Sequence, residues 1–157
     1  MDGDRPLSKT GAIRDVHAAG ADGVDMMPNI SFIKSGRYDE VRREMELLVE
    51  TSGDATIKAK LELGAVDDEE ADRIVDHAVN AAFDYIKNSS GWREGGKATV
   101  KRIEFLRERA PKDVKVKASG GIKTLGGARG LIDTGAVMLG ASSGVAILSS
   151  EVDNDTY

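Results

Sequence analysis

The feature that most constrains this chain is a regular alternation of short apolar runs with stretches of helical periodicity. Five runs, whose starts lie about 33, 27, 31 and 22 residues apart, are predicted strands: 23–27, 56–63, 83–87, 114–118 and 136–140. Amphipathic helices are predicted before, between and after them: 8–19, 37–50, 68–82, 97–109, a helix after Thr124, and 143–148. Strands that alternate with single helices predict βαβ units and a parallel sheet.

Two architectures fit this alternation, a doubly wound open sheet and a (β/α)₈ barrel. The barrel ordinarily needs eight units and about 250 residues. This chain has 157 residues and only five predicted strands, so its length by itself favours the open sheet. No linker or low-complexity segment divides the sequence, and residues 1–157 are therefore expected to form a single domain.

Composition and charge exclude several classes of function. A net charge of −5 argues against non-specific nucleic-acid binding. The absence of cysteine excludes disulfides, thiolate nucleophiles and cysteine-bound metals. His17 and His77 lie on predicted helices without an evident metal partner and are interpreted as surface or packing residues. No apolar run approaches the roughly 20 residues that span a bilayer, and the N-terminus MDGDRPLSKT lacks a signal region, so a cytoplasmic protein without membrane partners is expected.

Three of the predicted strands end in similar polar, glycine-containing loops. Their sequences are KNSSG at 87–91, KASGG at 117–121 and ASSG at 141–144. In a parallel sheet these loops share the carboxyl edge, where both candidate folds bind ligands. Small residues there allow backbone amides to approach a ligand closely. The sequence therefore predicts a ligand site at this edge.

Lys87 and Lys117 occupy equivalent positions on successive strands. If both side chains point inward, the repulsion between two nearby cations makes one of them easier to deprotonate. A neutral amine can attack a carbonyl and form an imine. The matched pair therefore favours a Schiff-base lysine with a cationic neighbour, whereas either lysine alone would be interpreted as a side chain that extends into solvent.

The loops after the fourth and fifth strands predict a phosphate site. Gly120 and Gly121 expose backbone amides, and Ser142 and Ser143 open the short predicted helix 143–148, whose N-terminal amides favour an anion. Ordinary tight turns with a serine cap are the alternative.

Several charged residues admit two interpretations. Asp25 lies among apolar strand residues, where it either relays protons or forms a structural ion pair with Lys58 or Lys60. Lys58, Lys60 and Glu62 alternate along one strand and are expected to form an ion-pair cluster. Trp92 is expected to be a lid or a packing residue.

These motifs together resemble the deoxyribose-phosphate aldolase family. VKASGGIKT at 116–124 is similar to the family's strand-seven signature, and YIKNSSG at 85–91 to its Schiff-base strand six. Residues 23–27, 57–64 and 140–144 resemble strands four, five and eight. The resemblance extends from about residue 6 to residue 148.

The resemblance implies an incomplete TIM (β/α)₈ barrel, strands four to eight with their helices. It implies a class I aldolase that reversibly cleaves 2-deoxy-D-ribose 5-phosphate into acetaldehyde and D-glyceraldehyde 3-phosphate, without metal or organic cofactor. Carried over to this sequence, Lys87 forms the imine, Lys117 lowers its pKa and Asp25 belongs to the proton relay. The phosphate site would comprise Gly91, Gly120, Gly121, Ser142 and Ser143, with Lys123 nearby.

The chain departs from the family pattern in two ways. Family members begin with three further strands, of which strands one and two supply substrate-facing groups. Many members also carry threonine at the position of Asn88 and a smaller or basic residue at that of Trp92. Alternatives are therefore a non-catalytic phosphate-binding fragment and an aldolase for another phosphorylated sugar. Because the first and last strands would have open edges and the inner face a bare apolar patch, we expect a homo-oligomer.

Overall fold

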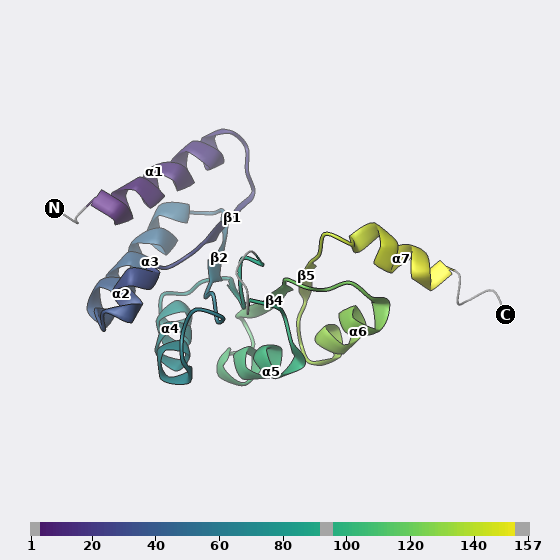
Figure 1. Ribbon diagram of the computed structural model, residues 1–157. Helices are drawn as coiled ribbons and strands as arrows, with labels where there is room; N and C mark the ends of the chain where they lie inside the picture. Colours follow the sequence, from purple (N-terminus) through teal and green to yellow (C-terminus); the bar gives the residue numbers. More distant parts are fainter. Residues whose placement is uncertain (1–3, 92–95, 153–157) are drawn as a thin grey trace.

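The computed structural model describes residues 4–91 and 96–152, in which helices and strands alternate along the chain (Figure 1). The strands are β1 (Gly23–Met26), β2 (Thr56–Lys60), β3 (Tyr85–Lys87), β4 (Lys115–Ser119) and β5 (Met138–Gly140). The helices are α1 (Asp4–Ala18), α2 (Ile30–Lys34), α3 (Tyr38–Ser52), α4 (Asp68–Asn80), α5 (Val100–Arg109), α6 (Leu125–Asp133) and α7 (Gly144–Val152).

The five strands form one parallel sheet in chain order, β1-β2-β3-β4-β5. A doubly wound open sheet reverses its strand order at a switch point, and the strands of the described region show no such reversal. Sequential order with a helix in each crossover is the arrangement of a (β/α)₈ barrel. Figure 1 shows α3, α4, α5 and α6 in an arc along the outer side of the sheet. The expected incomplete barrel is confirmed, and the open-sheet alternative is wrong.

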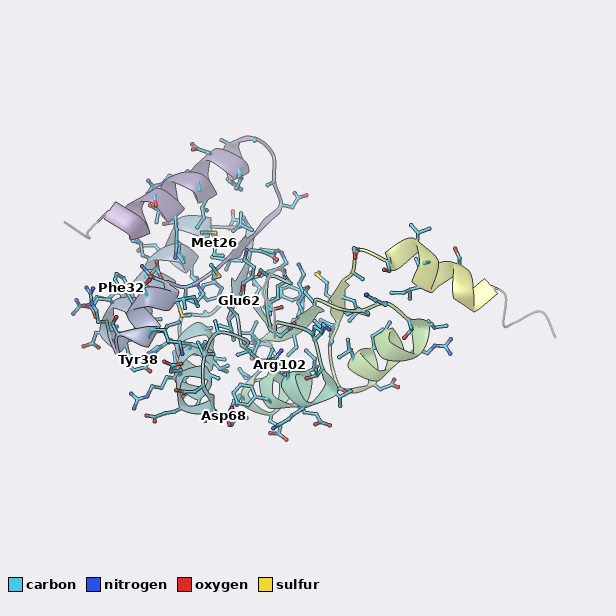
Figure 2. All side chains as sticks on the ribbon, viewed as in Figure 1. Met26, Phe32, Tyr38, Glu62, Asp68 and Arg102 are labelled. Carbon is cyan, nitrogen blue, oxygen red and sulfur yellow. The ribbon has the colours of Figure 1, made fainter. Side chains whose placement is uncertain are left out.

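The outer, convex face of the sheet forms the hydrophobic core with these helices (Figure 2). Register partners in a parallel sheet point to the same face, and the pairs Val24–Ile57 and Ile86–Val116 point toward the helices. All four side chains are buried, Ile86 and Val116 completely. The helices contribute further fully buried side chains: Val41, Met45, Ile74, Val75, Ile103 and Leu106. Burial of this apolar surface is the main stabilising contribution to the fold.

Helix α4 begins and ends for local reasons that can be identified. The Asp67 carboxylate accepts a hydrogen bond from the Glu70 amide at 2.9 Å, and the Glu70 carboxylate accepts one from the Asp67 amide at 2.8 Å. This reciprocal capping box satisfies two amide groups at the helix N-terminus. The helix ends at Asn80, two residues before the predicted end, and Ala82 adopts a left-handed φ of 64°.

Other element bounds differ modestly from the prediction. β2 ends at Lys60, before the predicted end at residue 63, because the chain turns at Glu62 with a φ of 51°. Helix α2 is absent from the prediction because it has only five residues, too few to show a helical period. Its first amides are capped by the Asn29 side chain, which accepts a hydrogen bond from Ser31 at 3.0 Å.

Within residues 4–91 and 96–152, no helix combines the length and apolar character needed to cross a bilayer. The same residues contain no group of three or more acidic or histidine side chains placed to hold a metal ion.

Candidate functional site

The inner, concave face of the sheet is polar and charged, in contrast to the core face. Asp25 and Lys58 are register partners, as are Lys60 and Lys87, and Lys87 and Lys117. Because side chains alternate between faces along a strand, all five residues lie on the concave side. The sequence-based expectation of a bare apolar inner face is therefore wrong for the described strands.

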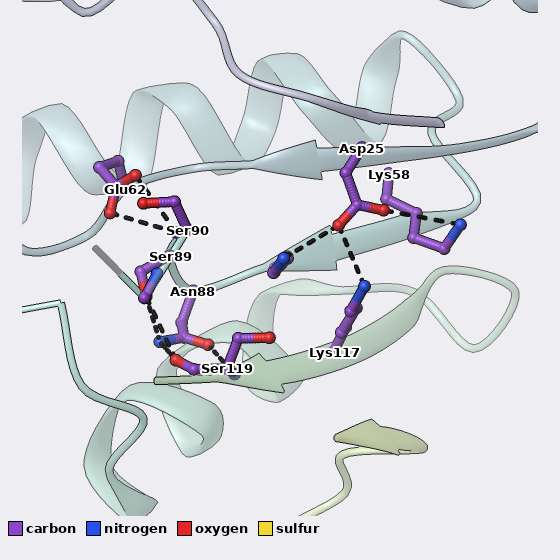
Figure 3. Close-up of polar contacts among 10 residues, drawn as sticks. Asp25, Lys58, Glu62, Asn88, Ser89, Ser90, Lys117 and Ser119 are labelled. Carbon is purple, nitrogen blue, oxygen red and sulfur yellow. Dashed lines mark hydrogen bonds and ion pairs between the residues drawn. The ribbon is translucent and has the colours of Figure 1, made fainter. Parts of the chain in front are cut away.

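Asp25 is the centre of a charged cluster on this face (Figure 3). Its Oδ2 atom accepts hydrogen bonds from the Nζ of Lys87 at 2.9 Å and from the Nζ of Lys117 at 3.0 Å. Its Oδ1 atom lies 3.7 Å from the Nζ of Lys58. Both of the first two ammonium groups contact a single oxygen, so they lie within a few ångströms of each other. The structure thus brings together the three residues that the sequence singles out for chemistry, Asp25, Lys87 and Lys117.

Burial lowers the pKa of the Lys87 amine below its ordinary value of 10.5. The hydrogen bond to Asp25 opposes this effect, and the positive charges of Lys117 and Lys60 add to the lowering. The Lys87 side chain is buried, and Lys117 is half-buried. A larger fraction of neutral amine is therefore available at Lys87 than at an exposed lysine.

The Asp25 carboxylate is held in its ionised form. Burial raises its pKa, but the hydrogen bonds from Lys87 and Lys117 outweigh that effect, and the net pKa lies below the ordinary 3.8. An ionised acceptor placed between two amines can take a proton from one side and return it on the other.

Lys60 has a different environment from Lys58, although both side chains lie on the concave face. No ion pair of Lys60 occurs within the described parts of the chain. Glu62 lies beyond the strand end, and both of its carboxylate oxygens accept from the Ser90 amide at 3.2 Å. The expectation that Lys58, Lys60 and Glu62 form one ion-pair cluster is therefore wrong, because the left-handed turn at Glu62 directs its carboxylate to the loop after β3.

The loop that follows Lys87 is fixed by Asn88, a fully buried residue that sequence reasoning did not assign to the site. Its Oδ1 accepts from the Ser119 amide at 2.8 Å, and its Nδ2 donates to the Ser119 carbonyl at 2.9 Å (Figure 3). Nδ2 also donates to the Gly96 carbonyl at 3.2 Å. This side chain continues the β3–β4 pairing beyond the end of β3 and holds the carboxyl edge of the sheet beside Lys87 and Lys117.

A cavity of about 520 Å³ opens at this edge. Lys87, Lys117 and residues of the three polar loops line it: Ser90, Gly91, Ser119, Gly120, Gly121, Ile122, Lys123, Gly140, Ala141 and Ser142. Five of the six predicted phosphate-site residues are thus brought to one cavity with both lysines, whereas Ser143 is not among the lining residues. Gly120 adopts a φ of +97°, a backbone conformation that side chains rarely allow.

A larger hollow of about 690 Å³ lies between α4 and α5 and shares only Gly91 and Gly121 with this cavity. Neither Lys87 nor Lys117 lines it, and both lysines line the smaller cavity. His17 is exposed and His77 is half-buried, consistent with surface and packing positions. Trp92 lies outside the described residues.

Comparison with known proteins agrees with this geometry. No protein-family model matches the chain. Deoxyribose-phosphate aldolase of Staphylococcus carnosus strain TM300 is 40% identical over 149 residues, which cover 94% of this chain and 67% of that protein. The enzyme of the same name from Streptococcus equi subsp. zooepidemicus is 38% identical over 92% of this chain and 65% of its own length.

A solved structure shows the same fold. The tetrameric deoxyribose phosphate aldolase of Aeropyrum pernix has a TM-score of 0.84 and 29% identity, and the match covers 95% of this chain and 63% of that one. The chain therefore spans about two thirds of the length of the relatives that it matches. The sequence identity, the barrel topology and the carboxyl edge lined by two lysines all agree. The chain belongs to the deoxyribose-phosphate aldolase family.

Proposed function

We propose that the chain carries the Schiff-base site of a 2-deoxy-D-ribose-5-phosphate aldolase, with Lys87 as the nucleophile. The observation that carries this proposal is the Lys87 amine, buried beside Lys117 and sharing the Asp25 carboxylate with it. The lowered pKa of Lys87 supports its role rather than that of the more exposed Lys117.

The chemistry follows from the reactivity of a neutral amine. Lys87 adds to the aldehyde carbon of the open-chain sugar phosphate, and loss of water gives a protonated imine. The imine accepts the electron pair when the bond between the second and third carbons breaks, and the third carbon's hydroxyl loses its proton. This releases D-glyceraldehyde 3-phosphate. Protonation of the remaining enamine at the second carbon, followed by hydrolysis, releases acetaldehyde and regenerates Lys87.

Asp25 and Lys117 have complementary roles in these steps. The Asp25 carboxylate lies within hydrogen-bonding distance of both amines and is suited to relay the protons that the reaction moves. Lys117 supplies a positive charge beside Lys87, which favours the neutral form of its neighbour.

We place the phosphate of the substrate at the loop end of the 520 Å³ cavity. The backbone amides around Gly91, Gly120 and Gly121 and the Ser142 hydroxyl are suited to bind phosphate oxygens, and Lys123 supplies a nearby positive charge. Ser143, the residue before α7, would contribute only if the loop moved toward the cavity, because it is not among the lining residues.

The test is turnover of 2-deoxy-D-ribose 5-phosphate, measured as release of D-glyceraldehyde 3-phosphate. Wild type is compared with Lys87→Ala and with Lys115→Ala, which removes an exposed lysine of the same sheet. Each is assayed alone and with a separately expressed segment holding the first three units of a related aldolase. We expect turnover that Lys87→Ala abolishes and Lys115→Ala preserves. Turnover that survives in Lys87→Ala contradicts the proposal, and a chain inactive in both settings is a non-catalytic fragment.

We also propose that the chain self-associates. Four apolar side chains near its C-terminal end are exposed, at 52% for Ile132, 63% for Val137, 83% for Val145 and 66% for Leu148. Exposed apolar surface of this kind commonly marks an interface, and the Aeropyrum pernix relative is tetrameric. We expect a solution mass of at least twice the 16.7 kDa of one chain. A monomer at micromolar concentration would contradict self-association.

A further inference from the structure

Ser119 has a buried hydroxyl group without a hydrogen-bonding partner. The residue is 4% exposed, and its Oγ atom is one of two such unpartnered side-chain atoms within residues 4–91 and 96–152; the other is Nε2 of His77. Buried hydroxyl groups are normally paired because an unmade hydrogen bond costs free energy. Because Ser119 is one of the residues that line the 520 Å³ cavity, its unpaired hydroxyl is a candidate for binding a ligand there.

The backbone of Ser119 is held in place by Asn88, whose side chain bonds both its amide and its carbonyl. The hydroxyl is thus the one polar group of Ser119 that the surrounding protein leaves unpaired. Figure 3 shows it at the end of β4, projecting from the same side of the strand as Lys117.

The neighbouring strand leaves space for this hydroxyl. Gly140 is the register partner of Ser119 on β5. A Cβ atom added at Gly140 would overlap Ser119 Oγ and would lie 3.8 Å from Cε of Lys117. A glycine at this position therefore makes room for the Ser119 hydroxyl beside the Lys117 side chain.

Ser119 lies between the two ends of the proposed substrate site. It is two residues beyond Lys117 on the same face, a rise of roughly 7 Å along a strand, and it directly precedes Gly120 and Gly121. A molecule that joins Lys87 at one end and places a phosphate at the glycine loop at the other must pass Ser119.

We propose that the Ser119 hydroxyl hydrogen-bonds the fourth-carbon hydroxyl of the substrate, which lies between the imine carbon and the phosphate. Ser119 would then help select phosphorylated sugars over simple aldehydes. This inference rests on the proposed function, and it adds a polyol-recognising contact to the lysine and phosphate groups already described.

The experiment measures the half-saturating concentration for borohydride trapping at Lys87, read by intact mass. Three probes are used: 2-deoxy-D-ribose 5-phosphate, its analogue lacking the fourth-carbon hydroxyl, and acetaldehyde. Ser119→Ala is compared with wild type and with Ser149→Ala, an exposed serine on α7. We expect Ser119→Ala to raise the value for the sugar phosphate about tenfold, the typical size of one hydrogen bond, and to leave acetaldehyde and the deoxygenated analogue unchanged.

The possible outcomes separate the two proposals. If wild type forms no adduct with any probe, the proposed function fails and this inference fails with it. If wild type traps the probes but Ser119→Ala changes none of them, or changes all of them equally, the Ser119 contact is wrong and the proposed function stands. An effect that persists in full with the deoxygenated analogue also overturns the contact with this hydroxyl.

Discussion

The two faces of a single sheet differ sharply in chemistry, although they are built from alternate residues of the same strands. On the convex face Ile86 and Val116 are completely buried against helices. On the concave face their immediate neighbours in sequence, Lys87 and Lys117, share a carboxylate. One face holds the fold together, and the other presents ionisable groups to a cavity.

Along each strand, residues that stabilise the fold by burial therefore alternate with residues that carry ionisable groups. Apolar side chains on the helix-covered face contribute the burial that stabilises the domain. The concave face carries more lysine than acid, and Asp25 contacts three of those lysines. Substitutions on the two faces should therefore have different consequences.

The largest expected effect comes from truncating a convex residue. Ile86→Ala removes fully buried methyl and methylene groups and should lower the free energy of unfolding by about 2–5 kcal/mol. Lys87→Ala, one residue later, should change it by less than about 1 kcal/mol, because Asp25 keeps Lys117 and Lys58 as partners. Urea denaturation of both variants measures the difference, and equal destabilisation would remove the distinction between the faces.

A smaller effect is expected from Asp25→Asn. Loss of the carboxylate leaves three lysines without their shared counter-charge and should cost about 1–3 kcal/mol of stability. Because Asp25 raises the pKa of Lys87, its loss should also shift the pH midpoint of imine trapping downward. A midpoint that rises would show that Asp25 does not act on Lys87 in this way.

Lys117→Leu should shift the pH midpoint of imine trapping in the direction opposite to Asp25→Asn, with little change in stability. The positive charge of Lys117 lowers the pKa of Lys87, so its removal should shift the trapping midpoint upward. The matched control is Lys115→Leu, since Lys115 lies on the same face but stacks on Tyr85, with its Nζ 5.3 Å from the ring centroid. Identical midpoints for the two variants would mean that Lys117 does not influence Lys87.

The smallest expected effect is a pH dependence of stability that originates on the concave face. Because the folded state holds the pKa of Lys87 below 10.5, the unfolded chain binds more protons between the lowered value and 10.5. Stability contributed by this group should therefore rise with pH through that window. Comparing denaturation curves of wild type and Lys87→Ala at several alkaline pH values isolates this contribution, and parallel curves would exclude it.

The sequence was sufficient for the parts of the molecule that depend on periodicity. The alternation of strands and helices indicates the parallel sheet, and the similar loops after two successive strands single out Lys87 and Lys117. Asp25 could be singled out as an acid in an apolar strand, with Lys58 as a possible partner, but its contacts with Lys87 and Lys117 depend on how the strands are arranged.

Other features of the site could not be read from patterns. The left-handed turn at Glu62 and the bonds from Asn88 to the Ser119 backbone depend on single side chains bonding across loops. The unpaired Ser119 hydroxyl can be recognised only from the structure, in which Gly140 lies opposite it on β5 and offers no side chain to pair with it. An asparagine after Lys87 and a glycine ending β5 were the available signals, and each is common in ordinary turns.

The most direct test of the central claim is to identify the lysine that acetaldehyde modifies. The full chain is incubated with acetaldehyde and borohydride, digested, and mapped by mass spectrometry, with Lys87→Ala and Lys117→Leu treated in parallel. A single reduced adduct on Lys87, absent from Lys87→Ala and formed at higher pH in Lys117→Leu, is the expected result. An adduct on Lys117 in the wild-type chain, or modification spread over exposed lysines and unchanged in Lys87→Ala, would contradict the assignment of Lys87 as the imine-forming residue.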